Sequence, residues 1–230
     1  MGGIIELVQV NKVYRGTVDS QVLFDINLSF EVGTCSAIVG VSGSGKTTLL
    51  NIMGTLDFPT GGEVLIDGKL VNNMTKNQLA HLRNETIGFV FQYHHLLPEF
   101  TALENVLMPY LIKRWRPSRE VIRRADELFD MLEITDVKNS PATRMSGGQQ
   151  QRTAIARALI NNPKIILTDE PTGNLDSETT KKICQGFREI NRRYDTTFIV
   201  VTHDHLVAEH TDRIVEIRDG RIVSDTKSNV

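Results

Sequence analysis

The fold of this chain is decided by the stretch at residues 40–48, which reads Gly40-Val41-Ser42-Gly43-Ser44-Gly45-Lys46-Thr47-Thr48. It fits G-x-x-x-x-G-K-[ST], the pattern of a loop that wraps around phosphate oxygens. Its glycines let successive backbone N–H groups turn toward an anion without a Cβ atom in the way. Lys46 can reach the β- and γ-phosphates, and the Thr47 hydroxyl can ligate Mg²⁺. The stretch predicts a nucleoside triphosphate site built from Gly40, Ser42, Gly43, Ser44, Gly45, Lys46, Thr47 and Thr48.

The segments that flank this loop supply the expected context. Residues 35–39 are predicted to form a short buried strand, and a helix is expected from Thr48 onward. A helix N-terminus at this point adds its partial positive charge to the phosphate site.

An acidic pair, Asp169 and Glu170, follows the buried apolar run at 165–167. An acid at the end of such a strand is the expected second half of an Mg·nucleotide site. Neighbouring side chains in an extended strand end point to opposite sides, so one carboxylate can face the metal and the other the attacking water. We assign Asp169 to Mg²⁺ and Glu170 to the general base; the alternative is that the pair caps the turn before Pro171.

Strand and helix patterns alternate along most of the chain. Apolar runs without alternation, separated by helices, indicate parallel strands covered on both faces, with ligands at their carboxyl ends. We expect a single α/β domain over residues 1–230, with a nucleotide-binding core at 1–92 and 160–230 and a helical subdomain at about 93–159. Strands are predicted at 4–14, 22–32, 63–68, 87–91, 165–167, 197–201, 214–217 and 222–224, and helices at 75–84, within 101–133 on either side of Pro117, at 146–162, 178–194 and 205–210.

Composition narrows the functional classes. The net charge of −2 gives no global electrostatic reason to expect a nucleic-acid partner. Two cysteines, Cys35 and Cys184, suggest neither a disulfide framework nor a metal site, which fits a reducing cytoplasm. No signal peptide and no run of 18 apolar residues is found, so we expect any membrane role to be peripheral.

A second phosphate-binding pattern occurs at 145–152, Met-Ser-Gly-Gly-Gln-Gln-Gln-Arg. Ser146 can cap a helix, and Gly147 and Gly148 leave its first N–H groups open to an anion. One nucleotide does not need two such phosphate-binding sites from one chain. Two chains that share two nucleotides would use both.

The set of motifs resembles the ATP-binding cassette (ABC) ATPases, over essentially the whole chain. It comprises the 40–48 loop, Gln92 after a strand, Ser-Gly-Gly-Gln at 146–149, Asp169-Glu170, Gly-Asn-Leu-Asp at 173–176, and His203. The resemblance implies an ATPase of the P-loop NTPase fold with a mostly parallel core sheet, an N-terminal antiparallel β subdomain and an inserted helical subdomain. It also implies ATP and Mg²⁺ as cofactors and a homodimer that closes head-to-tail on two ATP molecules.

The same resemblance assigns roles to single residues. The signature motif would complete the partner's nucleotide site through Ser146, Gly147, Gly148 and Gln149. Gln92 would sense Mg²⁺ and a membrane partner, Asp176 would lie at the dimer interface, and His203 would contact the γ-phosphate and orient Glu170. Tyr14 matches the aromatic residue that stacks on adenine, with an ordinary strand tyrosine as the alternative.

The segments 91–106 and 171–176 closely resemble cassettes of bacterial lipoprotein-releasing systems. This implies an ATPase at the cytoplasmic face of the inner membrane, bound to permease subunits through the apolar region after Gln92, at Leu96, Leu97, Pro98 and Phe100. Macrolide-exporter, antimicrobial-peptide-resistance and cell-division cassettes are similar. Those lipoprotein-releasing cassettes usually carry Leu-Ser-Gly-Gly-Glu-Arg-Gln-Arg where this chain has Met-Ser-Gly-Gly-Gln-Gln-Gln-Arg at 145–152, which leaves the substrate open.

Two other features have simpler interpretations. The basic segment 113–124 contains the only tryptophan; we interpret it as a solvated helical surface, with contact to anionic lipid headgroups as the alternative. His94 and His95 have no carboxylate or cysteine at ligand spacing, so we expect no zinc site there.

Overall fold

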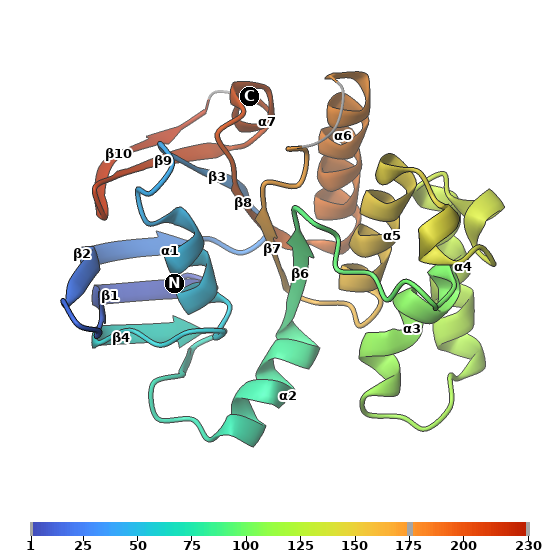
Figure 1. The fold of residues 1–230 in the computed structure, drawn as a ribbon, viewed down its shortest axis with the longest axis horizontal. Coiled ribbons are helices and arrows are strands. Elements are labelled where there is room, and N and C mark those ends of the chain that lie inside the picture. The colour runs from blue at the N-terminus through green and yellow to red at the C-terminus, as the bar shows by residue number, and fades with distance from the viewer. Residues whose placement is uncertain (1, 174–176, 229–230) are drawn as a thin grey trace.

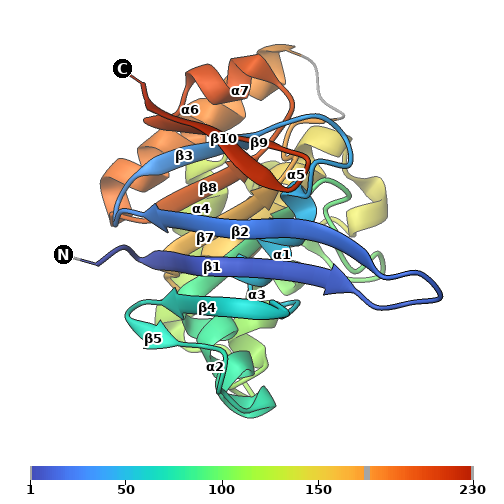
Figure 2. The ribbon, with the colours of Figure 1, turned by 90° about the vertical axis from the view of Figure 1, so that its left-hand side faces the viewer.

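The computed structural model describes residues 2–173 and 177–228, which fold around two β-sheets (Figure 1). The smaller sheet is antiparallel, with strand order β2-β1-β4-β5, and Figure 2 shows its strands side by side in this order. The N-terminal antiparallel sheet that the family resemblance implies is therefore confirmed. Its strands are β1 (Ile5–Tyr14), β2 (Ser20–Phe30), β4 (Gly61–Ile66) and β5 (Lys69–Leu70).

The larger sheet has six strands in the order β10-β9-β3-β8-β7-β6. Neighbouring strands from β9 to β6 run parallel, and only β10 pairs antiparallel, with β9. This confirms the mostly parallel α/β core. The strands are β3 (Cys35–Val39), β6 (Ile87–Phe91), β7 (Ile165–Asp169), β8 (Thr197–Val201), β9 (Arg213–Arg218) and β10 (Arg221–Lys227).

The core strands are buried on both faces, as their unbroken apolar runs predict. Along β7, Ile165 and Leu167 pack in the apolar cluster under the antiparallel sheet, whereas Ile166 packs in the cluster of the helical side. Alternate residues of a strand point to opposite faces, so one strand serves both cores. Phe198 and Ile199 of β8 divide between the clusters in the same way.

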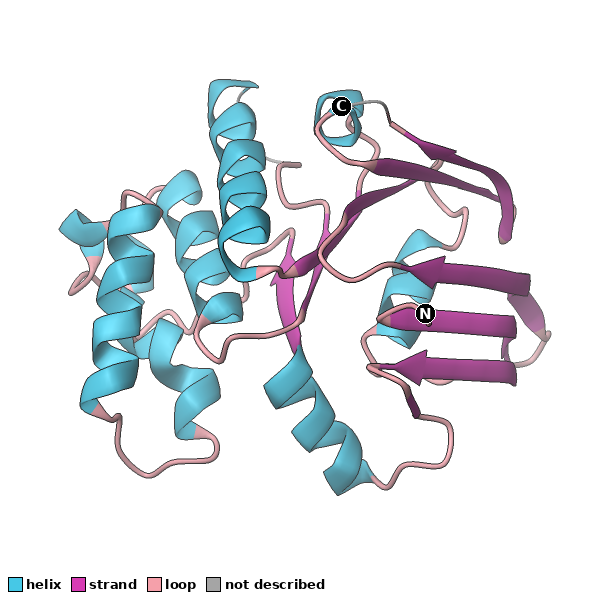
Figure 3. Ribbon diagram, turned by 180° about the vertical axis from the view of Figure 1, so that it is seen from behind, coloured by secondary structure: helices cyan, strands magenta, loops and turns pink. Residues whose placement is uncertain are grey.

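The helices differ from the predicted spans by a few residues at their ends. The predicted helix at 146–162 stops at Leu159, and Asn162 adopts a positive φ of 52° just before Pro163. Figures 1 and 3 show α3, α4 and α5 grouped on the side away from the antiparallel sheet. The helices are α1 (Lys46–Met53), α2 (Lys76–Thr86), α3 (Ala102–Leu111), α4 (Arg119–Met131), α5 (Gly147–Leu159), α6 (Ser177–Tyr194) and α7 (His205–Glu209), with 3-10 turns at Thr135–Val137 and Ala142–Arg144.

No helix within residues 2–173 and 177–228 combines the length and apolarity needed to cross a bilayer. Cys35 and Cys184 are buried free thiols, and burial raises the pKa of Cys35 to about 12 and that of Cys184 to about 11.

Candidate active site

The phosphate loop joins the carboxyl end of β3 to the N-terminus of α1, as its flanking segments predict. Gly43 and Gly45 have φ values of +79° and +103°, which favour glycine. A Cβ atom on Gly43 would meet no atom within 4 Å, so this part of the backbone is open to a ligand. Helix α1 begins after Gly45 without a side-chain cap, which leaves its first N–H groups available to an anion.

A cavity of about 640 Å³ lies against this loop, large enough for a nucleotide. It is lined by residues from four separate parts of the chain, namely Val22, Val41, Ser42, Gly43, Gly45, Lys46, Thr47, Thr48, Glu170 and His203. The strand order explains this meeting, because β3, β8 and β7 are neighbours and their carboxyl ends share one edge. The side chains after these strands therefore converge.

One polar side chain of the loop fits a phosphate ligand. The Lys46 ammonium is buried, lines the cavity and donates to the carbonyl oxygens of Gly40 and Val41, each at 2.8 Å. The Ser44 hydroxyl is also buried and has no hydrogen-bond partner among the described residues, but Ser44 does not line the cavity.

The Thr47 hydroxyl and the Asp169 carboxylate lie together at the ends of α1 and β7. Thr47 Oγ1 donates to Asp169 Oδ2 at 3.2 Å. Burial raises the pKa of Asp169, and the nearby Glu170 raises it further, while the Thr47 hydrogen bond opposes this. Oxygen ligands of this kind fit Mg²⁺, which takes its remaining ligands from phosphate and water. The described residues contain no group of three or more His, Cys, Asp or Glu side chains placed to hold a metal.

Glu170 and His203 form a direct pair, with Glu170 Oε1 2.7 Å from His203 Nδ1. The structure corrects our reason for the direction of Glu170. This residue lies beyond β7 with a φ of +46°, so it is not part of an extended strand. Its backbone N–H donates to the Val201 carbonyl of β8 at 2.8 Å, and this bond holds the turn in place.

Gln92 follows β6 and lies beside Glu170, although it does not line the cavity. A Cβ atom built on Gly173 would sit 3.0 Å from Gln92 Nε2 and 3.4 Å from Glu170 Oε2. The two side chains thus meet at Gly173, where any larger residue would push them apart.

The loop after Gln92 is tied to helix α5. Arg157 of α5 donates to the carbonyl oxygens of His94 and His95, each at 2.6 Å. Both histidines have positive φ values, and the His94 ring also hydrogen-bonds Gln151. No local sequence pattern indicates these contacts, because His94 and Gln151 are 57 residues apart.

The signature motif begins α5 but contributes nothing to the cavity lining in the same chain. Ser146 Oγ accepts the Gln149 N–H, and Gln149 Oε1 accepts the Ser146 N–H, which completes a capping box. Ser146 and Gly147 are exposed, and Gly148 and Gln149 half-buried, so the motif is presented on the outside of the molecule. Asp176 lies outside the described residues.

Tyr14 ends β1 and is partly exposed; it does not line the cavity. Two residues that we did not predict hold its ring. The Tyr14 hydroxyl donates to Asp57 Oδ2 at 2.9 Å, and the Lys12 ammonium lies 4.7 Å from the ring centroid. Lys12 is buried and donates to Asp57 Oδ1 at 2.5 Å. In the sequence, the only indication of this arrangement is Lys12, an inward-facing lysine two residues before Tyr14.

The segment after Gln92 is only partly exposed. Leu97 and Phe100 are exposed, as expected, but Leu96 packs against the helical core. Beside this segment, a groove of about 520 Å³ runs between α2, β6, α3 and α5. Its lining includes Phe89, Phe91, His95, Pro109, Ile112 and Arg157.

Comparison with known proteins identifies the family. The ABC transporter family matches residues 23–173. The lipoprotein-releasing system ATP-binding protein LolD 1 of Rhodopseudomonas palustris (strain ATCC BAA-98 / CGA009) is 49% identical over 96% of this chain and 99% of its own length. The lipoprotein-releasing system ATP-binding protein LolD of Anaeromyxobacter dehalogenans (strain 2CP-C) is 47% identical over 96% of this chain and 93% of its own.

A solved structure resembles this fold closely. It is the dimeric post-hydrolysis state of the ATP-binding cassette MJ0796 bound to ADP and Pi. It has a TM-score of 0.90 and 44% sequence identity, and the match covers 97% of this chain and 98% of that one. The chain therefore belongs to the ABC transporter family and is one of its ATP-binding cassettes, an ATPase.

Proposed function

We propose that this cassette drives a membrane transporter that releases lipoproteins from the bacterial inner membrane, and that it works at the cytoplasmic face as a homodimer closed on two ATP molecules. The main structural support for ATP hydrolysis is the cavity that is lined by both the phosphate loop and the Glu170–His203 pair. Relatives named for lipoprotein release, 47–49% identical over nearly the whole chain, support the transport part.

The loop residues bind and position the triphosphate. Lys46 would exchange its two loop carbonyls for β- and γ-phosphate oxygens. Thr47 and Asp169 would hold Mg²⁺, which when bound would supply positive charge to offset the charge that develops on the phosphoryl group. Tyr14 is our candidate for stacking on adenine, on the β1 side of the site.

Glu170 is our candidate general base. His203 holds Glu170 Oε1, while Glu170 Oε2 lies near Gly173 and Gln92. A carboxylate fixed in this way can accept a proton from a water molecule that attacks the γ-phosphate. His203 is largely exposed, with 66% of its side chain accessible, so it can also reach a γ-phosphate.

The signature motif supports a composite site. Its exposed cap at Ser146 and Gly147 is not part of the cavity in its own chain. In a head-to-tail dimer, Ser146, Gly148 and Gln149 of one copy would contact the γ-phosphate held by the other. Asp176 is proposed at the same interface.

Permease subunits are our proposed membrane partners. The apolar groove beside the segment after Gln92 would receive a cytoplasmic helix from them, since grooves of this kind bind the apolar face of helices. Arg157 lines this groove and also holds the loop after Gln92, so one side chain links the proposed docking groove to that loop.

A second candidate is a cassette of a macrolide or antimicrobial-peptide exporter, or of a cell-division or signalling complex that does not transport. The Gln149-Gln150-Gln151 sequence keeps this candidate open, because it differs from the usual lipoprotein-releasing signature and other relatives carry a Gln-rich form.

Replacement of Glu170 by glutamine tests the mechanism. Glu170→Gln keeps the size of the side chain but removes the base, so hydrolysis should fall about 10²–10⁴-fold while ATP binding persists. The variant should accumulate as a dimer in ATP, measured by size-exclusion chromatography with light scattering. Glu189→Gln, an exposed change on α6, is the control and should behave as wild type. A monomer with wild-type turnover at saturating ATP would overturn both the base and the dimer.

Identification of the partners tests the transport part. Affinity capture from detergent-solubilised membranes should recover integral-membrane permeases with this chain. Reconstituted with them, the cassette should release a lipidated protein from vesicles in an ATP-dependent manner. Release of a macrolide or peptide instead, with no lipoprotein release, would favour the second candidate.

A further inference from the structure

Residues 112–118 form a surface loop between α3 and α4, so the helical surface that we predicted at 113–124 is helical only from Arg119, where α4 begins. Every residue from Ile112 to Arg119 is exposed. Trp115 has 94% of its surface accessible and Ile112 has 73%. Two large apolar side chains therefore extend into solvent on one short loop, where the core does not use them.

Positive charge surrounds these apolar side chains. Residues 113–119 contain four cations, Lys113, Arg114, Arg116 and Arg119, and no acid, although the whole chain carries a net charge of −2. Lys113 pairs with Glu85 of α2 at 2.5 Å, which ties the loop to the body of the protein. Within residues 2–173 and 177–228, the three arginines have no ion-pair partner.

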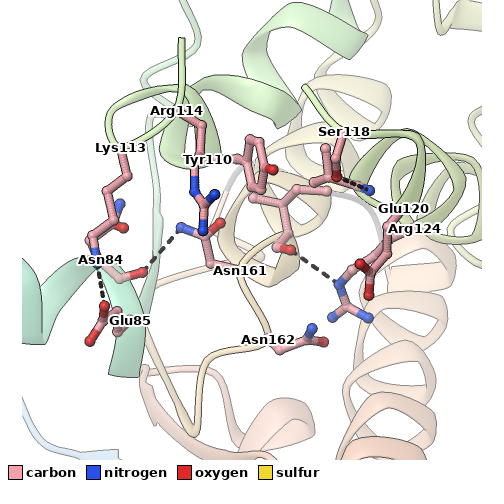
Figure 4. Close-up of a pocket in the computed structure, with 12 residues that line it drawn as sticks. Asn84, Glu85, Tyr110, Lys113, Arg114, Ser118, Glu120, Arg124, Asn161 and Asn162 are labelled. Atoms are coloured by element: carbon pink, nitrogen blue, oxygen red, sulfur yellow. Dashed lines mark hydrogen bonds and ion pairs between the residues drawn. The ribbon is translucent and has the colours of Figure 1, made fainter. Parts of the chain in front are cut away.

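The loop borders a polar cavity of about 490 Å³, shown in Figure 4. Arg114 from the loop and Arg124 from α4 extend into it, with the side chain of Asn161 nearby. The cavity also contains Glu85 and Glu120, so the exposed loop beside it, rather than the cavity itself, carries the excess positive charge.

The loop is continuous with the groove proposed for permease helices. Ile112 lines that groove, and Asn84 and Asn161 line both the groove and the cavity beside the loop. A permease seated in the groove would bring the loop near the bilayer surface. This step rests on the proposed function.

We propose that the 112–119 loop binds anionic phospholipid headgroups, with Trp115 inserted at the interface and Arg114, Arg116 and Arg119 paired with lipid phosphates. Tryptophan prefers the membrane–water interface because its ring is apolar and its N–H is polar. Arginines attract anionic lipid within a Debye length of the surface, each strengthening binding by about fivefold. Three of them together account for roughly a hundredfold.

The single tryptophan makes this directly testable. The full chain without nucleotide is titrated with phosphatidylcholine vesicles, with and without phosphatidylglycerol, at low ionic strength. Trp115 emission should shift to shorter wavelength only with phosphatidylglycerol, and salt should reverse the shift. The variant Arg114→Gln/Arg116→Gln/Arg119→Gln should bind roughly a hundredfold more weakly. The control Lys181→Gln/Arg192→Gln/Lys227→Gln removes three exposed cations from α6 and β10 and should bind as wild type.

Several results would overturn the proposal. These are no shift with either vesicle, an equal shift with neutral vesicles, or an undiminished shift in the arginine variant. Absence of vesicle binding would leave an acidic segment of a partner protein as the occupant. ATPase activity and ATP-dependent dimerisation are measured on the same variants without lipid and should be unchanged, so a failed lipid test is distinguishable from a failed proposed function.

Discussion

The Lys12–Asp57 ion pair beneath Tyr14 should respond unequally to loss of its two members. The Lys12 side chain is 9% exposed, whereas the Asp57 side chain is 27% exposed. Asp57→Asn leaves a buried cation with no carboxylate, since its remaining partners are the Phe58 carbonyl, a neutral amide and the Tyr14 ring. Removing one member of a buried pair costs about 3–5 kcal/mol, and partial exposure reduces this, so we expect about 2 kcal/mol.

Lys12→Met should be milder. The Asp57 carboxylate keeps the Phe58 N–H at 2.7 Å, the Tyr14 hydroxyl and contact with water, and methionine refills the space of the lysine stem. We expect the free energy of unfolding to fall by about 1 kcal/mol, which is the contribution of one charge-assisted hydrogen bond weakened by solvent. The double variant should lose about 2 kcal/mol rather than the sum of the two single losses, because its second change no longer leaves a buried charge without a partner.

Urea unfolding of the four proteins at neutral pH measures these free energies. Far-UV circular dichroism should be the probe, because Trp115 is already exposed in the folded state and its fluorescence reports unfolding poorly. If Lys12→Met is as damaging as Asp57→Asn, or if the two losses add, the ion pair is not a buried, asymmetric unit and the reasoning fails.

Three further predictions concern stability and reactivity. The Arg213 guanidinium holds the pKa of Asp225 low, so this pair stabilises the fold above pH about 4 and loses its effect below. Asp225→Asn should therefore flatten the acid side of a curve of stability against pH, by under about 1 kcal/mol because Asp225 is exposed. Gly88→Ala places a Cβ atom 2.5 Å from a backbone oxygen of α5 and should cost about 1–3 kcal/mol in urea unfolding, unlike Gly186→Ala, which meets nothing. Cys35 and Cys184 should react with a thiol reagent only after denaturation, since both thiols are buried away from the reagent and burial also raises their pKa.

Much of the fold was readable from short-range patterns. The Gly43–Lys46 loop, the capping box at Ser146 and the apolar runs of β3, β7 and β8 depend on residues within a few positions of each other. Backbone geometry and local hydrogen bonds act over that range, so the elements and most of their boundaries followed from the sequence. The meeting of strand ends at one site also followed, because parallel strands share an edge for their carboxyl ends.

The partnerships inside the site depended on the tertiary structure. The order β3-β8-β7-β6 places His203 beside Glu170 and Gln92 on its other side, and no spacing along the chain encodes that order. The positive φ of Glu170 arises from its bond to the Val201 carbonyl, a contact with another strand. The support of Tyr14 by Asp57 and the exposure of Trp115 likewise depend on long-range packing. Local sequence thus determined which groups this cassette carries, and packing between distant segments decided which of them touch.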